Sequence, residues 1–237
     1  MFLRDFYKLA DNKTLVSPEQ ASNFAKLIAD DFNPIHDPDA KRFCVPGDLL
    51  FSLFLEKYGL SQEMCFTFAG MVGKDVYLNF PESEENRIAI TGDNGKEYLY
   101  IDRRGDTSHN MDLIERFVKS YVAFSGHTFP HLLVPLMAEH NVMINPARPL
   151  VMYESMSVDL KTVDMNEPSL ELSKTSLKVN GKRGDAAITF LVKCDDEIVG
   201  KGVKKLVLSG LREFDQSQID QVVEFYSENK KKYQAGA

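Results

Sequence analysis

Residues 49–55 read LLFSLFL, and Ser52 is the one polar side chain among them. A helix over this stretch is apolar nearly all round, which is typical of a helix buried on more than one side. Such a helix needs walls, and a curved sheet is the element that can supply them. Short β-rich segments follow at 65–72, 75–80, 87–91 and 97–102, with a hairpin turn at 92–95. The stretch therefore predicts an antiparallel sheet wrapped around a buried helix.

A similar order of elements recurs in the second half of the chain. The pattern predicts an amphipathic helix over 111–124, a short apolar helix over 132–140 and strands over 151–160, 170–179, 186–194 and 198–208, then a last helix over 216–232. We interpret this recurrence as an internal duplication. The predicted fold class is α+β, with one unit over residues 1–105 and a second, degenerate unit over 106–237. Two such units side by side would bury each other's sheet edges.

Composition excludes several functional classes. The net charge is −7, which argues against a nucleic-acid partner because such proteins need a basic surface. The most basic segment, Lys230–Lys232, is interpreted as a solvated helix end. Three well-separated cysteines fit a reducing compartment and no disulfide framework. The sequence shows no signal peptide and no apolar run long enough for a bilayer. We therefore expect a cytoplasmic protein without a membrane partner.

Residues 29–36 read ADDFNPIH and hold the candidate chemistry. A helix capped by Ser17 is expected to end near Phe32, because Pro34 disfavours the helical conformation in the residue before it. Asp31 and His36 can then face one point and activate a water molecule. Unpaired N–H groups at Gly47, where the apolar helix begins, could stabilise an oxyanion. This set could add water to an activated double bond or hydrolyse a thioester; the alternative is an ordinary turn.

The run Asp31-Phe32-Asn33-Pro34-Ile35-His36 resembles the signature of the MaoC-like (R)-specific enoyl-CoA hydratases. The resemblance continues at 47–50 and 75–81 and covers residues 20–92. It implies a double hot-dog fold, in which two antiparallel sheets each wrap a buried helix. It also implies catalytic roles for Asp31 and His36 and oxyanion or substrate contacts from Gly47 and Asn33. The substrate would be a small-molecule coenzyme A thioester, with no other cofactor and no metal.

This sequence departs from the family pattern at several positions. Asp30 stands where the family has Gly, and a second carboxylate beside Asp31 could raise the pKa of one of the two. The link from His36 to Gly47 is shorter than in the family, and Pro46 replaces a His. In the second half, an alignment on Pro130 places His127 at the Asp31 position and Leu132 at the His36 position. The acid–base pair is therefore absent there, and His127 and His131 lack further placed ligands for a metal.

Together these observations predict a hydratase-like enzyme that adds water to, or removes it from, an acyl thioester such as an enoyl-CoA. Two alternatives stay open, an acyl-thioesterase and a non-catalytic protein that binds acyl-CoA or fatty acyl groups, because a fold does not fix a function. A homodimer is also left open as the assembly.

Overall fold

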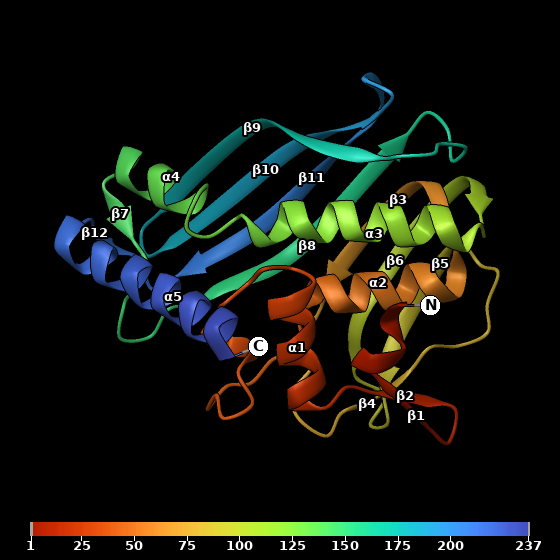
Figure 1. Ribbon diagram of the computed structural model, residues 1–237, viewed down its shortest axis with the longest axis horizontal. Helices are drawn as coiled ribbons and strands as arrows, with labels where there is room; N and C mark the ends of the chain where they lie inside the picture. The colour runs from red at the N-terminus through yellow and green to blue at the C-terminus, as the bar shows by residue number, and fades with distance from the viewer. Residues whose placement is uncertain (1, 237) are drawn as a thin grey trace.

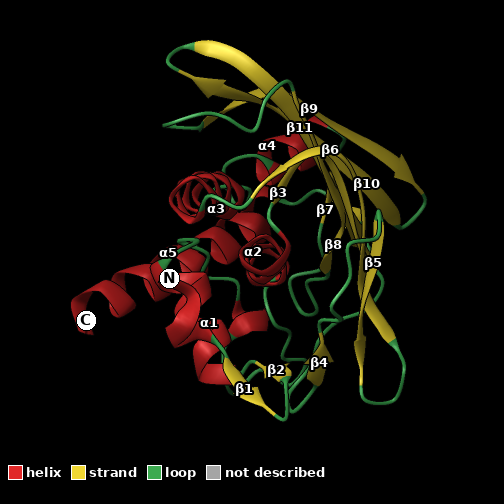
Figure 2. Cartoon of the chain, turned by 90° about the vertical axis from the view of Figure 1, so that its right-hand side faces the viewer, coloured by secondary structure: helices red, strands yellow, loops and turns green. Residues whose placement is uncertain are grey.

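A computed structural model describes residues 2–236. Ten strands of this part of the chain form one antiparallel sheet, and the long helices α2 and α3 lie against one face of it (Figure 1, Figure 2). In spatial order the strands are β1 (Lys8–Ala10), β2 (Lys13–Leu15), β4 (Tyr77–Asn79), β5 (Arg87–Gly92), β6 (Glu97–Ser108), β3 (Leu60–Phe68), β8 (Val151–Leu160), β11 (Glu197–Ser209), β10 (Arg183–Cys194) and β9 (Ser169–Asn180). A separate antiparallel pair joins β12 (Arg212–Glu213) to β7 (Val142–Met143). The predicted α+β class is confirmed.

The helical elements are η1 (Phe2–Phe6), α1 (Pro18–Leu27), η2 (Pro34–His36), α2 (Gly47–Tyr58), α3 (Met111–Gly126), α4 (Leu133–Glu139) and α5 (Gln216–Gly236). Helix α1 begins as predicted, because Ser17 and Gln20 form both hydrogen bonds of a capping box. Helices α2 and α3 lie side by side across the sheet, whereas α5 lies near α1 (Figure 1).

Helix α2 is buried, as its apolar sequence predicts, but the sheet is not its only wall. The ring of Phe51 lies 5.0 Å from that of Phe66 on β3 and 4.7 Å from that of Tyr121 on α3, measured between centroids. Phe51 and Tyr121 are both fully buried. The sheet therefore covers one side of α2, and α3 covers another, so that each long helix shields the apolar surface of its neighbour.

The sheet is built from two halves with the same strand order. Outward from the centre, the first half runs β3-β6-β5-β4 and the second runs β8-β11-β10-β9. Within each of these sets of four, counted along the chain, the first strand is innermost and is followed by the fourth, third and second. Strands β2 and β1 extend the first half beyond β4. The innermost strands β3 and β8 pair with each other in antiparallel register, for example Cys65 with Ser157. This pairing makes one continuous sheet and removes an exposed edge from each half.

Two features differ from the prediction. Strand β6 continues through Ser108, which pairs with Leu60, so most of the expected break between the two units is strand. In the second half the helix beside α2 is α3, not the short helix predicted at 132–140. That short helix, α4, packs Leu133 and Met137 into a smaller apolar cluster with β10 and β11.

Candidate functional site

The loop after α1 is shaped by Asp30. Helix α1 ends at Leu27, so the prediction of a helix up to Phe32 is wrong. Asp30 has a φ of +53°, in the left-handed region that Gly favours and that Asp tolerates better than most residues. The N–H of Asp31 then returns to the carbonyl oxygen of Ala25 at 2.8 Å. The chain therefore reverses at Asp30, before Pro34 can act, and Asp31 stands in the loop.

Asn33 and Pro34 set the second bend of this loop. The side-chain oxygen of Asn33 accepts the N–H of Ile35 at 3.2 Å and caps the short helix η2. The N–H of Asn33 donates to Asp31 Oδ1 at 2.9 Å. Since its side-chain oxygen is engaged in the turn, Asn33 has a structural role here, and its predicted contact with substrate stays a prediction.

Asp31 and His36 face each other across a gap. His36 Nε2 lies 3.8 Å from Asp31 Oδ2, and the two side chains are 12% and 28% exposed. His36 Nδ1 lies 2.7 Å from the carbonyl oxygen of Cys44, which can only accept, so Nδ1 carries a hydrogen, and in the neutral imidazole Nε2 presents a lone pair. Two acceptors at this separation are too far apart for a direct hydrogen bond but suit a water that donates to both.

Gly47 begins α2, as predicted, but the space left by its missing side chain is filled. A Cβ atom at Gly47 would lie 2.7 Å from the ring of Tyr153 and 3.2 Å from that of Phe68. These two rings stack with their centroids 4.4 Å apart. A ligand carbonyl therefore has no room on this side of Gly47, and the oxyanion role stays a prediction that depends on the N–H groups of the first helical turn.

A buried polar chain lies beside this helix start. Lys204 Nζ donates to Ser125 Oγ, and Ser125 Oγ donates to Asp48 Oδ2 at 2.6 Å. Lys204 also lies 4.6 Å from the centroid of the Tyr153 ring, within the range of a cation–π contact. Burial raises the pKa of Asp48, while Lys204 and the bond from Ser125 act in the opposite direction. The chain joins α2 to α3 and β11.

Sequence reasoning missed this chain, although one signal was present. Strand β11 buries alternate residues, and Lys204 occupies an inward position between Gly202 and Leu206. A lysine at an inward position of an alternating strand indicates a buried polar partner, because an unpaired buried charge is costly. No comparable signal distinguishes Ser125 from other serines at helix ends.

The C-terminal helix α5 covers the Asp31 loop. The hydroxyl of Tyr226 accepts the buried N–H of Phe32 at 3.0 Å and lies 3.4 Å from Asp31 Oδ1. Burial and the charge of Asp31 raise the pKa of Tyr226 above its ordinary value. Lys230 pairs with Asp30, while Lys231 and Lys232 are exposed near the end of α5, as the interpretation of a solvated helix end predicts. The acid at position 30 thus helps to hold α5 on the loop.

The second-half loop meets the first at the same place. His127 Nε2 lies 4.0 Å from Asp30 Oδ2, and the His127 and His131 rings lie 5.8 Å apart between centroids. Gly126, just before His127, packs directly on the carbonyl group of Ala29. The loop containing His127 is therefore part of the surroundings of Asp30 rather than a separate copy of the site. In the described chain, no three His, Cys, Asp or Glu side chains are arranged to hold a metal ion.

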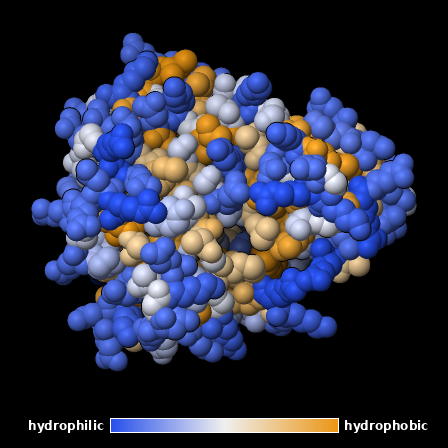
Figure 3. Space-filling model, turned by 180° about the vertical axis from the view of Figure 1, so that it is seen from behind, coloured by the Kyte–Doolittle hydropathy of each residue, from blue (hydrophilic) through white to orange (hydrophobic). Residues whose placement is uncertain are grey.

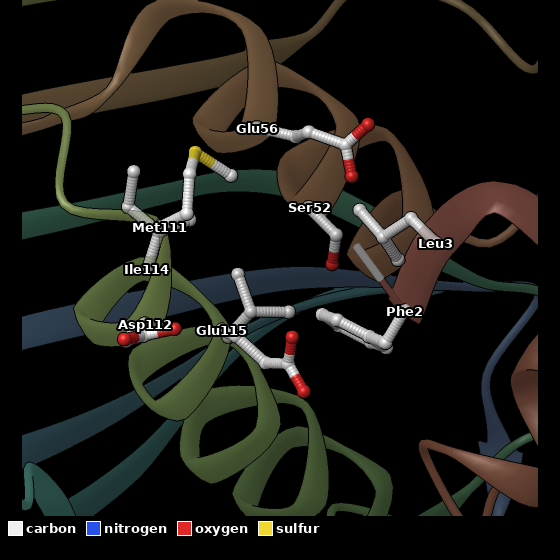
Figure 4. Close-up of a pocket in the computed structure, with 9 residues that line it drawn as sticks. Phe2, Leu3, Ser52, Glu56, Met111, Asp112, Ile114 and Glu115 are labelled. Atoms are coloured by element: carbon white, nitrogen blue, oxygen red, sulfur yellow. The ribbon is translucent and has the colours of Figure 1, made fainter.

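Two cavities lie near these elements. A groove of about 470 Å³ between the Asp31 loop and α5 is lined by Lys26, Phe32, Phe225 and Tyr233, among others. A smaller cavity of about 80 Å³ lies between η1, α2 and α3, with Ser52 and Glu56 in its wall (Figure 4). Neither is lined by Asp31 or His36. The face seen from behind is also hollowed near its middle, with a hydrophilic floor and a largely hydrophobic rim (Figure 3).

Comparison with known proteins gives a family and several distant structures. Residues 1–217 match a family described as "Protein of unknown function (DUF3581)". No curated protein matches the chain. One similar structure is a conserved protein of unknown function with hot dog fold from Alicyclobacillus acidocaldarius, at 9% identity and a TM-score of 0.45, covering 88% of this chain and 98% of that one. Another is an acyl-CoA thioesterase II from Mycobacterium marinum, at 9% identity and a TM-score of 0.39, covering 72% of this chain and 90% of that one.

A third is a putative oleoyl thioesterase from Lactobacillus plantarum, at 9% identity and a TM-score of 0.38, covering 82% of this chain and 90% of that one.

Among the helices of residues 2–236, none is long and apolar enough to cross a membrane.

Proposed function

We propose that this chain, which belongs to the family described as "Protein of unknown function (DUF3581)", activates water for addition to an acyl thioester. The observation that carries the proposal is the gap of 3.8 Å between His36 Nε2 and Asp31 Oδ2. Because Nδ1 of His36 donates to the carbonyl oxygen of Cys44, the imidazole ring has a fixed orientation and its Nε2 points toward Asp31. A water in this gap is poised to lose a proton to His36.

The first candidate reaction is hydration of an enoyl thioester. The oxygen of the water forms a bond to the β-carbon, the electrons of the double bond move toward the thioester carbonyl, and the proton taken by His36 returns to the α-carbon. The resemblance of residues 31–36 to the MaoC-like hydratases supports this reaction. Asp31 keeps its Oδ2 free for water, because its other oxygen is already engaged by the N–H of Asn33.

The proposed architecture is a double hot dog with units over residues 1–105 and 106–237. The repeated strand order on either side of the β3–β8 pair supports this assignment, as does the presence of one long buried helix in each half. The acid–base pair belongs to the first unit alone. The second unit contributes Ser125 and Lys204 to the surroundings of α2.

Thioester hydrolysis is the second candidate reaction. The same water could attack the thioester carbonyl directly, and the partial exposure of Asp31 and His36 lets solvent renew it after each turnover. The remaining alternative, binding of acyl-CoA without chemistry, predicts no turnover at all. The two reactions differ in what becomes of the thioester bond, because hydration leaves it intact and hydrolysis releases free thiol.

The test is to incubate the protein with crotonyl-CoA while enoyl absorbance and free thiol are followed together. Loss of enoyl absorbance without release of thiol indicates hydration. Release of one thiol for each enoyl thioester lost indicates hydrolysis. Asp31→Asn and His36→Ala should each lower kcat by about 10²–10⁴-fold, as expected for loss of a general base. Asp39→Asn is the matched control, since Asp39 is exposed in the same loop region and should leave the rate unchanged. No turnover by the wild type over several acyl chain lengths would exclude both reactions.

A further inference from the structure

One hydroxyl group of α5 contacts the loop on both sides of Asp31. The hydroxyl oxygen of Tyr226 accepts the N–H of Phe32 at 3.0 Å and lies 3.3 Å from the carbonyl oxygen of Asp30 and 3.4 Å from Asp31 Oδ1. The hydroxyl has one hydrogen, so it donates either to the carbonyl of Asp30 or to the carboxylate of Asp31. Its partners are thus the residue before Asp31, the Asp31 side chain and the residue after it.

The loop needs such an anchor because residues 31–33 lie in neither a helix nor a strand. Their N–H groups find partners in three different places. The N–H of Asp31 donates to the carbonyl oxygen of Ala25 on α1, and the N–H of Asn33 donates to Asp31 Oδ1. The N–H of Phe32, which lies between them, donates to Tyr226 on α5. The backbone around the carboxylate is therefore fixed by α1 on one side and by α5 on the other.

The same contacts set the orientation of the Asp31 carboxylate. Oδ1 accepts the N–H of Asn33 at 2.9 Å and faces the Tyr226 hydroxyl, whereas Oδ2 faces His36 across the gap of 3.8 Å. Because both donors lie toward Oδ1, rotation of the carboxylate that exchanges its two oxygens is restricted. His36 is fixed separately, through the carbonyl oxygen of Cys44. The two members of the pair thus have independent anchors, and the anchor of Asp31 includes α5.

Attachment of α5 to the protein does not by itself require this hydroxyl. Ile219 is fully buried in the smaller apolar cluster, and Lys230 pairs with the loop. The ring of Tyr226 packs edge-to-face on Phe32 and Phe129, with centroids 6.1 and 5.4 Å away. A phenylalanine could make these ring contacts equally well. Tyr226 is 7% exposed, and a tyrosine hydroxyl that is buried needs polar partners, which it finds in the loop of Asp31.

We infer that Tyr226 is a positioning residue for the proposed reaction, whose hydroxyl holds Asp31 at the distance from His36 that one bridging water spans. The inference rests on the proposed function. Tyr226 acts through Asp31 alone, and it neither contacts the substrate nor transfers a proton. The family match ends at residue 217, so this inference places part of the site on a helix that lies almost entirely beyond the matched residues.

Kinetics with crotonyl-CoA test the role. Tyr226→Phe keeps the ring and removes the oxygen, and kcat should fall by about 10–10²-fold, because a displacement of about 1 Å can cost about 10²-fold. KM should change by less than about twofold, since the lost contact does not bind substrate. Two controls on α5 should keep the wild-type kcat. Tyr233→Phe removes a neighbouring hydroxyl, and Ile219→Val loosens α5 at a buried position in the other apolar cluster. Unchanged kcat in Tyr226→Phe, or an equal loss in Ile219→Val, would overturn the inference.

A measurement without substrate keeps the inference separate from the proposed reaction. In protein labelled with ¹⁵N at histidine, the chemical shift of His36 Nε2 reports the hydrogen bond that this nitrogen accepts, and His36→Ala identifies the signal. We expect the shift to change in Tyr226→Phe, although Tyr226 does not touch His36, and to stay unchanged in Tyr233→Phe and Ile219→Val. This result without any turnover of crotonyl-CoA by the wild type would refute the proposed function and leave the positioning of Asp31 by Tyr226 standing. An unchanged shift in Tyr226→Phe would refute the positioning role whatever the activity.

Discussion

Tyr226→Phe tests whether α5 holds the Asp31 loop through a single hydroxyl group. In the wild type this hydroxyl accepts the N–H of Phe32 at 3.0 Å, and Phe32 is 3% exposed. The substitution removes the oxygen and keeps the aromatic ring, so the edge-to-face contact between the rings at 226 and 32, 6.1 Å between centroids, can persist. The change therefore isolates the hydrogen bonds of one hydroxyl group, which also donates to the carbonyl oxygen of Asp30 at 3.3 Å.

The expected loss follows from what is left behind. Without the hydroxyl, the N–H of Phe32 stays buried and unpaired, which costs about 1–3 kcal/mol. For a chain of this length, 1 kcal/mol corresponds to a shift in Tm of roughly 2–4 °C, so a loss of about 2 kcal/mol lowers Tm by roughly 4–8 °C. The longer contacts of the Tyr226 hydroxyl with the carbonyl oxygen of Asp30, at 3.3 Å, and with Asp31 Oδ1, at 3.4 Å, add little to this sum.

The assay is urea unfolding followed by circular dichroism, because the chain has no tryptophan to report by fluorescence. Tyr233→Phe is the matched control. Tyr233 lies on the same helix and its ring also packs on Phe32, 5.8 Å between centroids, but its hydroxyl forms no hydrogen bond within the described chain. We expect the control to change stability by less than about 0.5 kcal/mol. Equal effects of the two substitutions would refute the role assigned to the Tyr226 hydroxyl.

Two further predictions concern the contacts around α2 and α3. Gly126→Ala should destabilise the protein by about 1–3 kcal/mol despite the better helix propensity of Ala, because the new methyl group meets the carbonyl of Ala29. Gly73→Ala is the control, because nothing lies within 4 Å of its new methyl group. An unfolding free energy of Gly126→Ala equal to that of the wild type would contradict the packing of Gly126 on Ala29. The raised pKa of Asp48 means that the folded chain holds this proton more tightly than the unfolded chain, so its contribution to stability falls as pH rises from about 4 through the folded pKa. Asp48→Asn should therefore gain stability relative to wild type at neutral pH but not near pH 4, and a difference independent of pH would show that Asp48 is charged in the folded protein.

Much of the fold could be predicted because it depends on local patterns. The capping box at Ser17 and Gln20 placed the start of α1, and strand β8 occupies the predicted residues 151–160. The end of α1 could not be predicted from Pro34, because the reversal comes from the left-handed backbone of Asp30. Asp30 also pairs with Lys230, a contact that no local pattern indicates.

The sequence by itself determined that residues 49–55 are buried and that a run of strands follows the helices in each half of the chain. It also determined that Asp31 and His36 lie near each other. These features depend on periodicity or on a few neighbouring residues. Tertiary structure alone decided that α3 covers α2 and that α5 covers the Asp31 loop. It also decided that Asp48 meets Ser125 and that Asp30 meets Lys230, partners that lie 77 and 200 residues apart in the chain. Such contacts depend on sheet register and helix packing, which sum weak preferences over the whole chain and leave no local pattern in the sequence.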